Sequence, residues 1–253
     1  MLMKDKVCVV TGAASASGIG RATAELLAAN GADVVMLDMS DAIQAAACDI
    51  ASRHEGRTII GYQCDITSPV ACTAAAQKVS RRFPKINALI HCAGLIKSGR
   101  YDEIEPQDFD LVVAVNLTGS FNIAKAFAPT LIASGKGSII NLASVAGQRG
   151  GGLVGGAHYA ASKGGVLGLT KSLARELGPQ GVRANAVCPS LIETGFVTGS
   201  VSTERIRDLT SSIPLGRPGL PEEVASVCMF LASDLSSYIT GATLDVNGGS
   251  HIH

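Results

Sequence analysis

Tyr159 and Lys163 are the two side chains whose types and spacing most directly suit proton transfer. They stand four residues apart in the segment HYAASKGG, and in a helix this spacing places both on one face. An unperturbed phenol has a pKa of about 10, and a neighbouring ammonium favours the phenolate. We therefore interpret Tyr159 as a candidate general acid and base, against the alternative of an ordinary surface pair.

Two further polar residues stand in otherwise apolar surroundings. Ser144 ends the run IINLAS, and Asn116 lies in VVAVNLTGSF, in the middle of an apolar helical pattern. A buried amide needs hydrogen-bond partners, so Asn116 predicts a local kink or a specifically held water. The alternative is a core amide that its surroundings satisfy. Together with Tyr159 and Lys163, these residues form the candidate catalytic set.

The segment TGAASASGIG, residues 11–20, suits the binding of a phosphate. It follows an apolar strand pattern and opens a helical one, and a helix N-terminus offers free N–H groups and a positive dipole. Glycines let the backbone approach a ligand closely. Five residues separate Gly12 from Gly18, with Gly20 two positions further on, so the spacing is irregular.

Asp38 ends the next apolar run, VVMLD, eighteen residues after Gly20. An acid at this place accepts hydrogen bonds from the hydroxyls of an adenosine ribose and repels a 2′-phosphate. No Arg or Lys occurs between Gly12 and Gly20, and Met39 follows Asp38, so the cations that suit a 2′-phosphate are missing here. We therefore favour NAD over NADP, with NADP kept as an alternative; Asp38 could instead cap the following helix.

The elements that must position these residues alternate between strands and helices. Several apolar runs are continuous rather than alternating, which is typical of strands buried on both faces of a parallel sheet. The pattern predicts an α/β fold of Rossmann type: a doubly wound, seven-stranded parallel sheet with helices on both faces. Strands are expected at 6–11, 33–38, 57–65, 87–94, 137–144, 182–189 and 241–249, and helices at 18–30, 40–53, 69–83, 107–133, 157–177 and 221–233.

Composition sets further limits. The chain has 253 residues, 47% hydrophobic and 17% charged, with 21 basic and 21 acidic side chains, and no linker divides it, so we expect one domain over 1–253. The charge balance argues against nucleic acid and anionic membranes, and we expect no apolar stretch long enough to span a bilayer. The seven cysteines lack metal-ligand spacing. They indicate a cytoplasmic protein with reduced core cysteines and no metal site.

In these features the chain resembles the short-chain dehydrogenase/reductase family over nearly its whole length. The resemblance is carried by the glycine loop, Asp38, Asp65, HCAG at 91–94, Asn116, Ser144, Tyr159-x-x-x-Lys163, a proline after the sixth strand and the closing YITGATLDVNGG. It implies a nicotinamide-dependent oxidoreductase acting on a ketone or secondary alcohol.

The resemblance also implies a role for each catalytic residue. Tyr159 exchanges a proton with the carbonyl or alcohol oxygen, and Ser144 hydrogen-bonds that oxygen. Lys163 holds the nicotinamide ribose and lowers the pKa of Tyr159, while Asn116 positions a water that relays protons. Such preorganised donors stabilise the alkoxide that develops beside the hydride.

For the cofactor, the resemblance implies contacts along one edge of the sheet. Asp65 and Ile66 lie against the adenine, CAG lies under the adenosine ribose, and Thr194 lies near the carboxamide. Asp65 could also cap the helix that follows it. The expected cofactor-binding residues are Gly12, Ser15, Ser17, Gly18, Ile19, Asp38, Asp65, Ile66, Cys92, Ala93, Gly94, Tyr159, Lys163, Pro189, Ile192 and Thr194.

The sequence departs from the family pattern in three places. The usual NNAG reads HCAG, the usual PG after strand six reads Pro189-Ser190, and the glycine loop carries two extra residues. We interpret His91 as a packed strand-end residue rather than a catalyst. The extra residues are expected to bulge outward near the pyrophosphate, where Ser15 and Ser17 could donate hydroxyls.

The candidate substrate pocket is mostly apolar, which favours an uncharged ketone or alcohol. Residues 190–220 are the least regular and are expected to form a substrate-loop lid. The expected substrate-binding residues are Ser144, Val145, Leu153, Val154, Tyr159 and Phe196. The alternatives are an NADPH-linked 3-oxoacyl-(acyl-carrier-protein) reductase and a non-enzymatic dinucleotide sensor. The family also implies a homotetramer formed through the helices at 107–133 and 157–177 and through the C-terminal strand.

Overall fold

A seven-stranded parallel sheet forms the centre of the molecule, as predicted. The structure is a computed structural model, and it describes residues 1–151, 155–195 and 210–253. The strand order is β3-β2-β1-β4-β5-β6-β7, so the chain reverses its direction of travel across the sheet between β1 and β4. The strands are β1 (Val7–Thr11), β2 (Asp33–Asp38), β3 (Ile59–Gln63), β4 (Ala88–His91), β5 (Gly137–Leu142), β6 (Val182–Pro189) and β7 (Thr243–Val246).

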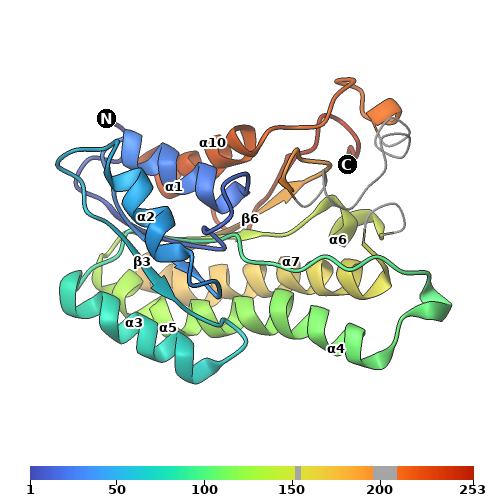
Figure 1. The fold of residues 1–253 in the computed structure, drawn as a ribbon, viewed down its shortest axis with the longest axis horizontal. Helices are drawn as coiled ribbons and strands as arrows, with labels where there is room; N and C mark the ends of the chain where they lie inside the picture. Colours follow the sequence, from blue (N-terminus) through green and yellow to red (C-terminus); the bar gives the residue numbers. More distant parts are fainter. Residues whose placement is uncertain (152–154, 196–209) are drawn as a thin grey trace.

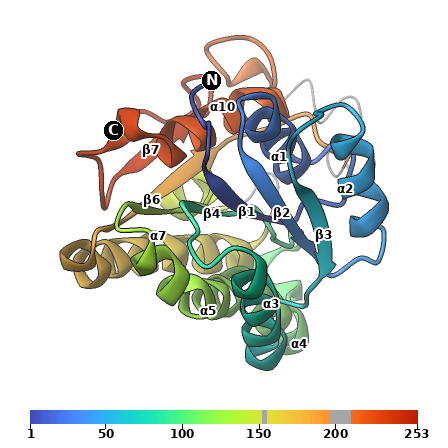
Figure 2. The same cartoon turned by 90° about the vertical axis from the view of Figure 1, so that its left-hand side faces the viewer.

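Helices cover both faces of this sheet, which makes a three-layered molecule (Figures 1 and 2). One face carries α1 (Ile19–Ala29), α2 (Ile43–Ala51) and α10 (Pro221–Ala232). The other carries α3 (Pro69–Arg82), α4 (Pro106–Val113), α5 (Gly119–Ala133) and α7 (Ala157–Leu177). The short α6 (Val145–Arg149) follows β5 and lies at the same end of the molecule as the C-terminus (Figure 1). Single 3₁₀ turns occur at Tyr101–Glu103, Gly178–Gln180 and Asp234–Ser236.

The continuous apolar runs are explained by two hydrophobic cores, one on each side of the sheet. Along β1, Val10 faces the core beneath α1, α2 and α10, whereas Val9 faces the core above α3, α5 and α7. Met36 and Val35 divide between the two cores in the same way in β2, and all four side chains are fully buried. Because both faces are covered, alternate positions are equally apolar, as expected for a parallel sheet.

The predicted helix at 107–133 is one helical stretch in three parts. A π-helical turn, Ala114–Thr118, joins α4 to α5 and contains Asn116. The sequence predicted a local distortion of the helix at this buried amide, and the π turn is that distortion. Single π turns inside an α-helix often occur at functional sites.

By length and composition alone, Pro106–Ala133 could cross a membrane, with a mean hydropathy of 1.4 in its most apolar window. The expectation that no segment is long and apolar enough is therefore wrong. In the fold, this stretch is a core helix: α5 packs against α3, β4 and β5, and α4 packs against α7. Phe127 of this stretch is fully buried in the protein interior, whereas Phe109, Leu111 and Phe121 are exposed.

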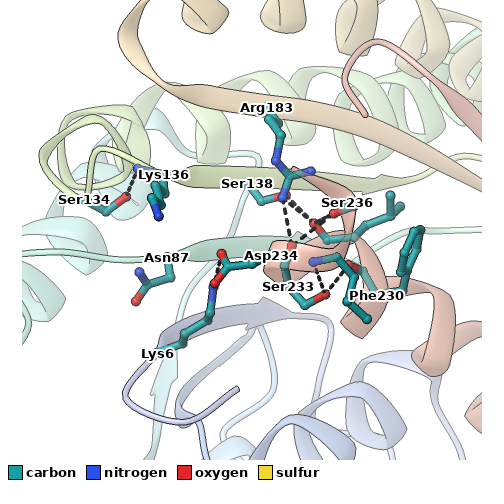
Figure 3. Close-up of polar contacts among 12 residues, drawn as sticks. Lys6, Asn87, Ser134, Lys136, Ser138, Arg183, Phe230, Ser233, Asp234 and Ser236 are labelled. Atoms are coloured by element: carbon teal, nitrogen blue, oxygen red, sulfur yellow. Dashed lines mark hydrogen bonds and ion pairs between the residues drawn. The ribbon is translucent and has the colours of Figure 1, made fainter. Parts of the chain in front are cut away.

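At the ends of the strands opposite the glycine loop, Arg183 holds the end of α10 against the sheet (Figure 3). Its guanidinium donates to the carbonyls of Leu231 at 2.9 Å and Ile239 at 3.2 Å. Ser138 of β5 donates to the same Leu231 oxygen at 2.8 Å, and Lys6 pairs with Asp234 at 2.7 Å. The two bonds to Leu231 satisfy a carbonyl that the C-terminus of α10 leaves without a helical partner. The opposite ends of the strands hold the candidate site.

Candidate active site

The glycine loop follows β1, next to the point between β1 and β4 at which the strand order reverses. Open α/β sheets bind their ligands at this point, beyond the carboxyl ends of the strands. Gly12 has a φ of +67°, and a Cβ added there would come within 2.6 Å of the Ala93 backbone. A Cβ on Gly20 would lie 2.3 Å from the Gly12 carbonyl oxygen. These two glycines therefore let three backbone segments meet, and the N-terminus of α1, whose N-cap Gly18 offers no side chain, faces the crevice with its N–H groups.

The two extra residues form a tight turn that reaches a distant segment. The Gly18 amide donates to the Ser15 carbonyl at 3.0 Å, which closes the turn over Ala16 and Ser17. The Ser17 hydroxyl accepts a hydrogen bond from the Gly195 amide at 2.8 Å. The insertion thus contacts the chain that follows β6, a partner that the sequence did not indicate.

Asp38 is held at the mouth of the glycine loop. Its Oδ2 accepts from the Ala14 amide at 3.0 Å, and its Oδ1 accepts from the Ser40 amide at 3.0 Å. Helix α2 begins at Ile43, so Asp38 does not cap it and that alternative is wrong. Each oxygen keeps acceptor capacity for a ribose hydroxyl.

Asp65 likewise does not cap the helix that follows it. The N-cap of α3 is Ser68, which accepts from the Ala71 amide at 3.2 Å. The exposed Asp65 carboxylate instead accepts from the amide and hydroxyl of Thr67, at 2.9 and 2.7 Å. Ile66 beside it is buried against Gly119, where an added Cβ would lie 2.7 Å from the Ile66 side chain.

Asn116 joins the loop after β4 to α7. Its Oδ1 accepts from the Leu95 amide at 2.8 Å, while its Nδ2 donates to the Leu95 carbonyl at 2.9 Å and to the Ser162 hydroxyl at 3.0 Å. The amide is therefore a satisfied core amide as well as the centre of the π turn. A Cβ on Gly94 would lie 3.2 Å from Asn116 Oδ1 and 3.4 Å from Lys163 Nζ, so Gly94 leaves room for both groups.

Lys163 and Tyr159 share one buried face of α7, as their spacing predicted. Lys163 Nζ donates to the Leu142 carbonyl at 2.6 Å and lies 5.9 Å from the centroid of the Tyr159 ring. Burial lowers the pKa of Lys163 to about 8, because the charged ammonium loses its hydration.

The pKa of Tyr159 differs from the sequence-based expectation. Burial raises it to about 12, and a hydrogen bond with Ser144 offsets part of that rise. We expected the lysine to favour the phenolate, but in this structure the cost of desolvating the phenolate outweighs other influences. The protein alone therefore keeps Tyr159 as a neutral phenol, ready to donate a proton.

His91 is a structural residue, as interpreted from the sequence. It is buried, its Nδ1 lies 2.7 Å from the Thr11 hydroxyl, and that hydroxyl accepts from the Ala93 amide at 3.1 Å. Which of Thr11 Oγ1 and His91 Nδ1 donates depends on the tautomer of the ring. Burial and the nearby Lys163 lower the pKa of His91 to about 3, so the ring is neutral at physiological pH.

Two cavities meet at Ser144 and Tyr159. A cavity of about 160 Å³ is lined by both residues and by Lys163. Six further residues of the expected cofactor site also line it: Ile19, Cys92, Gly94, Pro189, Ile192 and Thr194. A larger cavity of about 340 Å³ shares Ser144 and Tyr159 and continues toward α6 and the C-terminal tail.

The larger cavity contains residues that the sequence did not single out as a site. Val145 lines it as expected, but Leu153, Val154 and Phe196 lie outside the described residues, as does much of the expected lid at 190–220. Ile96, Leu191 and Ile192, which the sequence also suggested for the pocket, line it as well. The wall residues that the sequence did not single out include Ala146, Ser212, Ile213 and Ser250.

The fold and this site define an oxidoreductase of Rossmann type, and comparison with known proteins gives its family. A family model described as enoyl-(acyl carrier protein) reductase matches residues 12–251. An uncharacterized short-chain type dehydrogenase/reductase of Sinorhizobium fredii is 46% identical over 254 residues, covering 100% of both chains. The chain therefore belongs to the short-chain dehydrogenase/reductase family, whose members use nicotinamide cofactors.

Other relatives are similar over the same length. A 3-oxoacyl-[acyl-carrier-protein] reductase of Thermotoga maritima is 39% identical, covering 98% of this chain and 99% of that protein. A (3R)-3-hydroxyacyl-CoA dehydrogenase of Rattus norvegicus is also 39% identical, covering 98% and 96%. The solved structure of a short-chain type dehydrogenase/reductase from Mycobacterium ulcerans matches with a TM-score of 0.93 and 30% identity, covering 99% and 91%.

Proposed function

We propose that the protein interconverts a ketone and a secondary alcohol, with NAD(H) as its preferred cofactor. The observation that carries this proposal is the sharing of Ser144 and Tyr159 between the two cavities. A reacting oxygen at this junction would be within reach of both hydroxyls while its carbon faced the smaller cavity. The nicotinamide, when bound there, supplies or accepts the hydride.

The chain's own residues would then perform the acid–base chemistry. In carbonyl reduction, Tyr159 donates its phenolic proton to the developing alkoxide, and Ser144 stabilises the same oxygen. Lys163, whose ammonium is held by the Leu142 carbonyl, provides a positive charge that stabilises the phenolate left on Tyr159. Asn116 keeps the loop after β4 in register with α7, which holds the wall of the smaller cavity in place.

The preference for NAD(H) rests on Asp38. Its carboxylate is anchored by the Ala14 and Ser40 amides at the end of β2, where a dinucleotide of this fold places its adenosine ribose. Those bonds fix the negative charge without neutralising it, so a 2′-phosphate would be repelled.

The test is a panel of ketones with NADH and NADPH, and of secondary alcohols with NAD⁺ and NADP⁺, followed by absorbance of the reduced nicotinamide. We expect turnover with NADH and NAD⁺ that Tyr159→Phe removes almost completely. Turnover that survives Tyr159→Phe would contradict the proposed chemistry, and a clear preference for NADPH would contradict the role of Asp38.

A second candidate is the reduction of 3-oxoacyl thioesters, or the oxidation of 3-hydroxyacyl thioesters. The names of the relatives from Thermotoga maritima and Rattus norvegicus favour it. An acetoacetyl thioester assayed beside simple ketones distinguishes the two candidates through the ratio of their kcat/KM values. No reduction of any substrate despite tight NADH binding would favour the non-enzymatic dinucleotide sensor.

We also propose a homotetramer in the cytoplasm, assembled through the helices at 107–133 and 157–177 and through the C-terminal strand. Phe109, Leu111 and Phe121 of α4 and α5 are each more than 40% exposed, and covering them would bury apolar surface. Sedimentation at micromolar concentration tests the assembly, since a species of only about 26 kDa, the mass of one chain, would refute it.

A further inference from the structure

We propose that Arg149 selects substrates that carry an anionic group, a carboxylate or a phosphate, a short distance from the reacting carbonyl. This inference rests on the proposed function and narrows its substrate class. Arg149 ends α6, the helix that Ser144 begins as its N-cap. It is the only charged residue among those that line the larger cavity in the described part of the chain.

One N–H group of the guanidinium is bound by the protein, and the other N–H groups can bind a ligand. Its Nη1 donates to the Ser250 carbonyl at 2.8 Å, and Ser250 itself lines the cavity. An arginine has five N–H donors, and no carboxylate of the described residues pairs with this one. The remaining donors are therefore available to a ligand, and their forked arrangement suits carboxylate and phosphate oxygens.

The partner of Arg149 is itself held in place. The Ser250 hydroxyl donates to the Ser190 hydroxyl at 2.9 Å, and Asn247 Nδ2 donates to the His251 carbonyl at 2.8 Å. This tail is thus fastened to the chain after β6, which reduces the ordering needed when a ligand binds. Arg149 is exposed, and its hydrogen bond to this fastened tail orients its guanidinium before a ligand binds.

The acidic group beside α6 is already engaged. Asp245 accepts from Gln148 Nε2 at 2.8 Å and lies 3.2 Å from His253 Nε2. The partners of this carboxylate are therefore Gln148 and His253 rather than the guanidinium. An incoming anion would therefore meet an arginine whose charge is not cancelled by an ion pair.

The size of the cavity limits the substrate. In a helix the rise is about 1.5 Å per residue, so Ser144 and Arg149 are separated by roughly 7 to 8 Å along α6. A volume of about 340 Å³ is at the small end for ligand sites. These dimensions favour a compact oxo or hydroxy acid, or a small phosphorylated ketone, over a long uncharged ketone.

The experiment compares each anion with a neutral analogue of similar size. The pairs are 4-oxopentanoate with its methyl ester, for a carboxylate, and hydroxyacetone phosphate with hydroxyacetone, for a phosphate. We expect the wild type to prefer the anion of at least one pair. Arg149→Gln should lower the ratio of kcat/KM for that anion to kcat/KM for its analogue by about 10- to 100-fold, the range of a hydrogen bond to a charged group. Arg149→Lys should retain part of the preference.

Arg81→Gln is the matched control, since Arg81 is an exposed residue in the last turn of α3 and its replacement removes the same charge. It should leave the ratio unchanged. A ratio that Arg149→Gln does not change, or that Arg81→Gln changes equally, would overturn the inference.

A binding measurement separates this inference from the proposed function. The chain has no tryptophan, so the fluorescence of bound NADH can report the anion without protein background from indole. If the anion binds the NADH complex in a manner that depends on Arg149 but no ketone is reduced, the proposed function fails and the inference stands. If ketones are reduced and no anion binds more tightly to the wild type than to Arg149→Gln, the inference fails and the function stands.

Discussion

The Gly195 amide donates a hydrogen bond to the Ser17 hydroxyl at 2.8 Å, across 178 residues of sequence. Ser17 belongs to the two extra residues of the glycine loop, and Gly195 belongs to the chain that leaves β6. A Cβ on Gly195 would come within 2.7 Å of the Ser17 oxygen, so the two segments are in close contact. The insertion therefore links the expected phosphate site to the edge of the cavity that Thr194 lines.

Deleting Ala16 and Ser17 should change dinucleotide binding and leave the fold intact. The turn they form is at the surface and contributes little to either core, so we expect unchanged far-ultraviolet circular dichroism. Loss of the link to Gly195 should weaken NADH binding by about 3- to 10-fold, the usual value of one neutral hydrogen bond. Fluorescence titration with NADH and NADPH measures it.

Ser17→Ala should reproduce most of that loss, whereas Ser15→Ala tests the other hydroxyl of the same turn. Equal dinucleotide affinity in the deletion variant and the wild type would identify the insertion as a neutral surface bulge.

Tyr159→Phe should lower kcat by about 10²- to 10⁴-fold, because positioned proton transfer contributes that much to a reaction rate. The phenyl ring keeps the packing of this buried side chain, which is 7% exposed, so stability should change little. Steady-state assays together with NADH titration check this prediction. NADH affinity should stay near the wild-type value; a variant that loses affinity and activity alike would point to a binding role instead.

Asp38→Ser combined with Met39→Arg should shift cofactor preference toward NADP(H). The change removes the charge that repels a 2′-phosphate and introduces a cation at an exposed position. We expect NADH affinity to fall by about 10-fold or more, since hydrogen bonds to charged groups are lost. The ratio of kcat/KM for the two cofactors is the measurement, and Met39→Arg alone separates the added cation from the lost acid.

The two reaction directions should respond to pH with opposite sign. Tyr159 has a pKa of about 12 in the protein alone, so its neutral form is available for carbonyl reduction throughout the usual range. Lys163, with a pKa of about 8, is charged below that value and neutral above it. Reduction should therefore be nearly constant below pH 8 and fall above it, while alcohol oxidation rises with pH because it needs the phenolate.

Lys163→Arg provides the comparison, because a guanidinium does not lose its proton in this range. The decline of reduction above pH 8 should disappear in that variant, at a lower rate throughout. An identical profile in wild type and variant would assign the titration to another group.

His91 should make the wild type sensitive to mild acid. Its folded-state pKa of about 3 is depressed from 6.5, so between these values the unfolded chain binds a proton that the folded protein does not. Stability is therefore lost as pH falls from 6.5 toward 3, by at most about 1.4 kcal/mol per pH unit. Urea denaturation of the wild type and of His91→Asn at pH 7 and pH 5 measures the difference.

The Asn variant should lose less stability over that interval, by up to about 2 kcal/mol, because it has no group that titrates there. Parallel losses in both proteins would show that other residues govern the acid response.

The sequence determined the architecture and the catalytic set of this protein. Continuous apolar runs such as KVCVV specify strands buried on both faces, and the position of residues at strand ends places Ser144, Asp38 and the glycine loop at one edge. The four-residue spacing of Tyr159 and Lys163 fixes their common face on α7. These inferences succeed because each depends on local periodicity or on the fixed direction of parallel strands.

Tertiary structure alone decided the pKa of Tyr159, the partners of Asp38 and the walls of the larger cavity. Burial acts on a phenol through all the atoms around it, so a neighbouring lysine in the sequence did not reveal that the pKa rises. Arg149 and Ser250 are a hundred residues apart, and Ser17 and Gly195 even more, yet each pair is joined by a hydrogen bond. Such contacts arise from the packing of the whole chain, and no local pattern in the sequence encodes them.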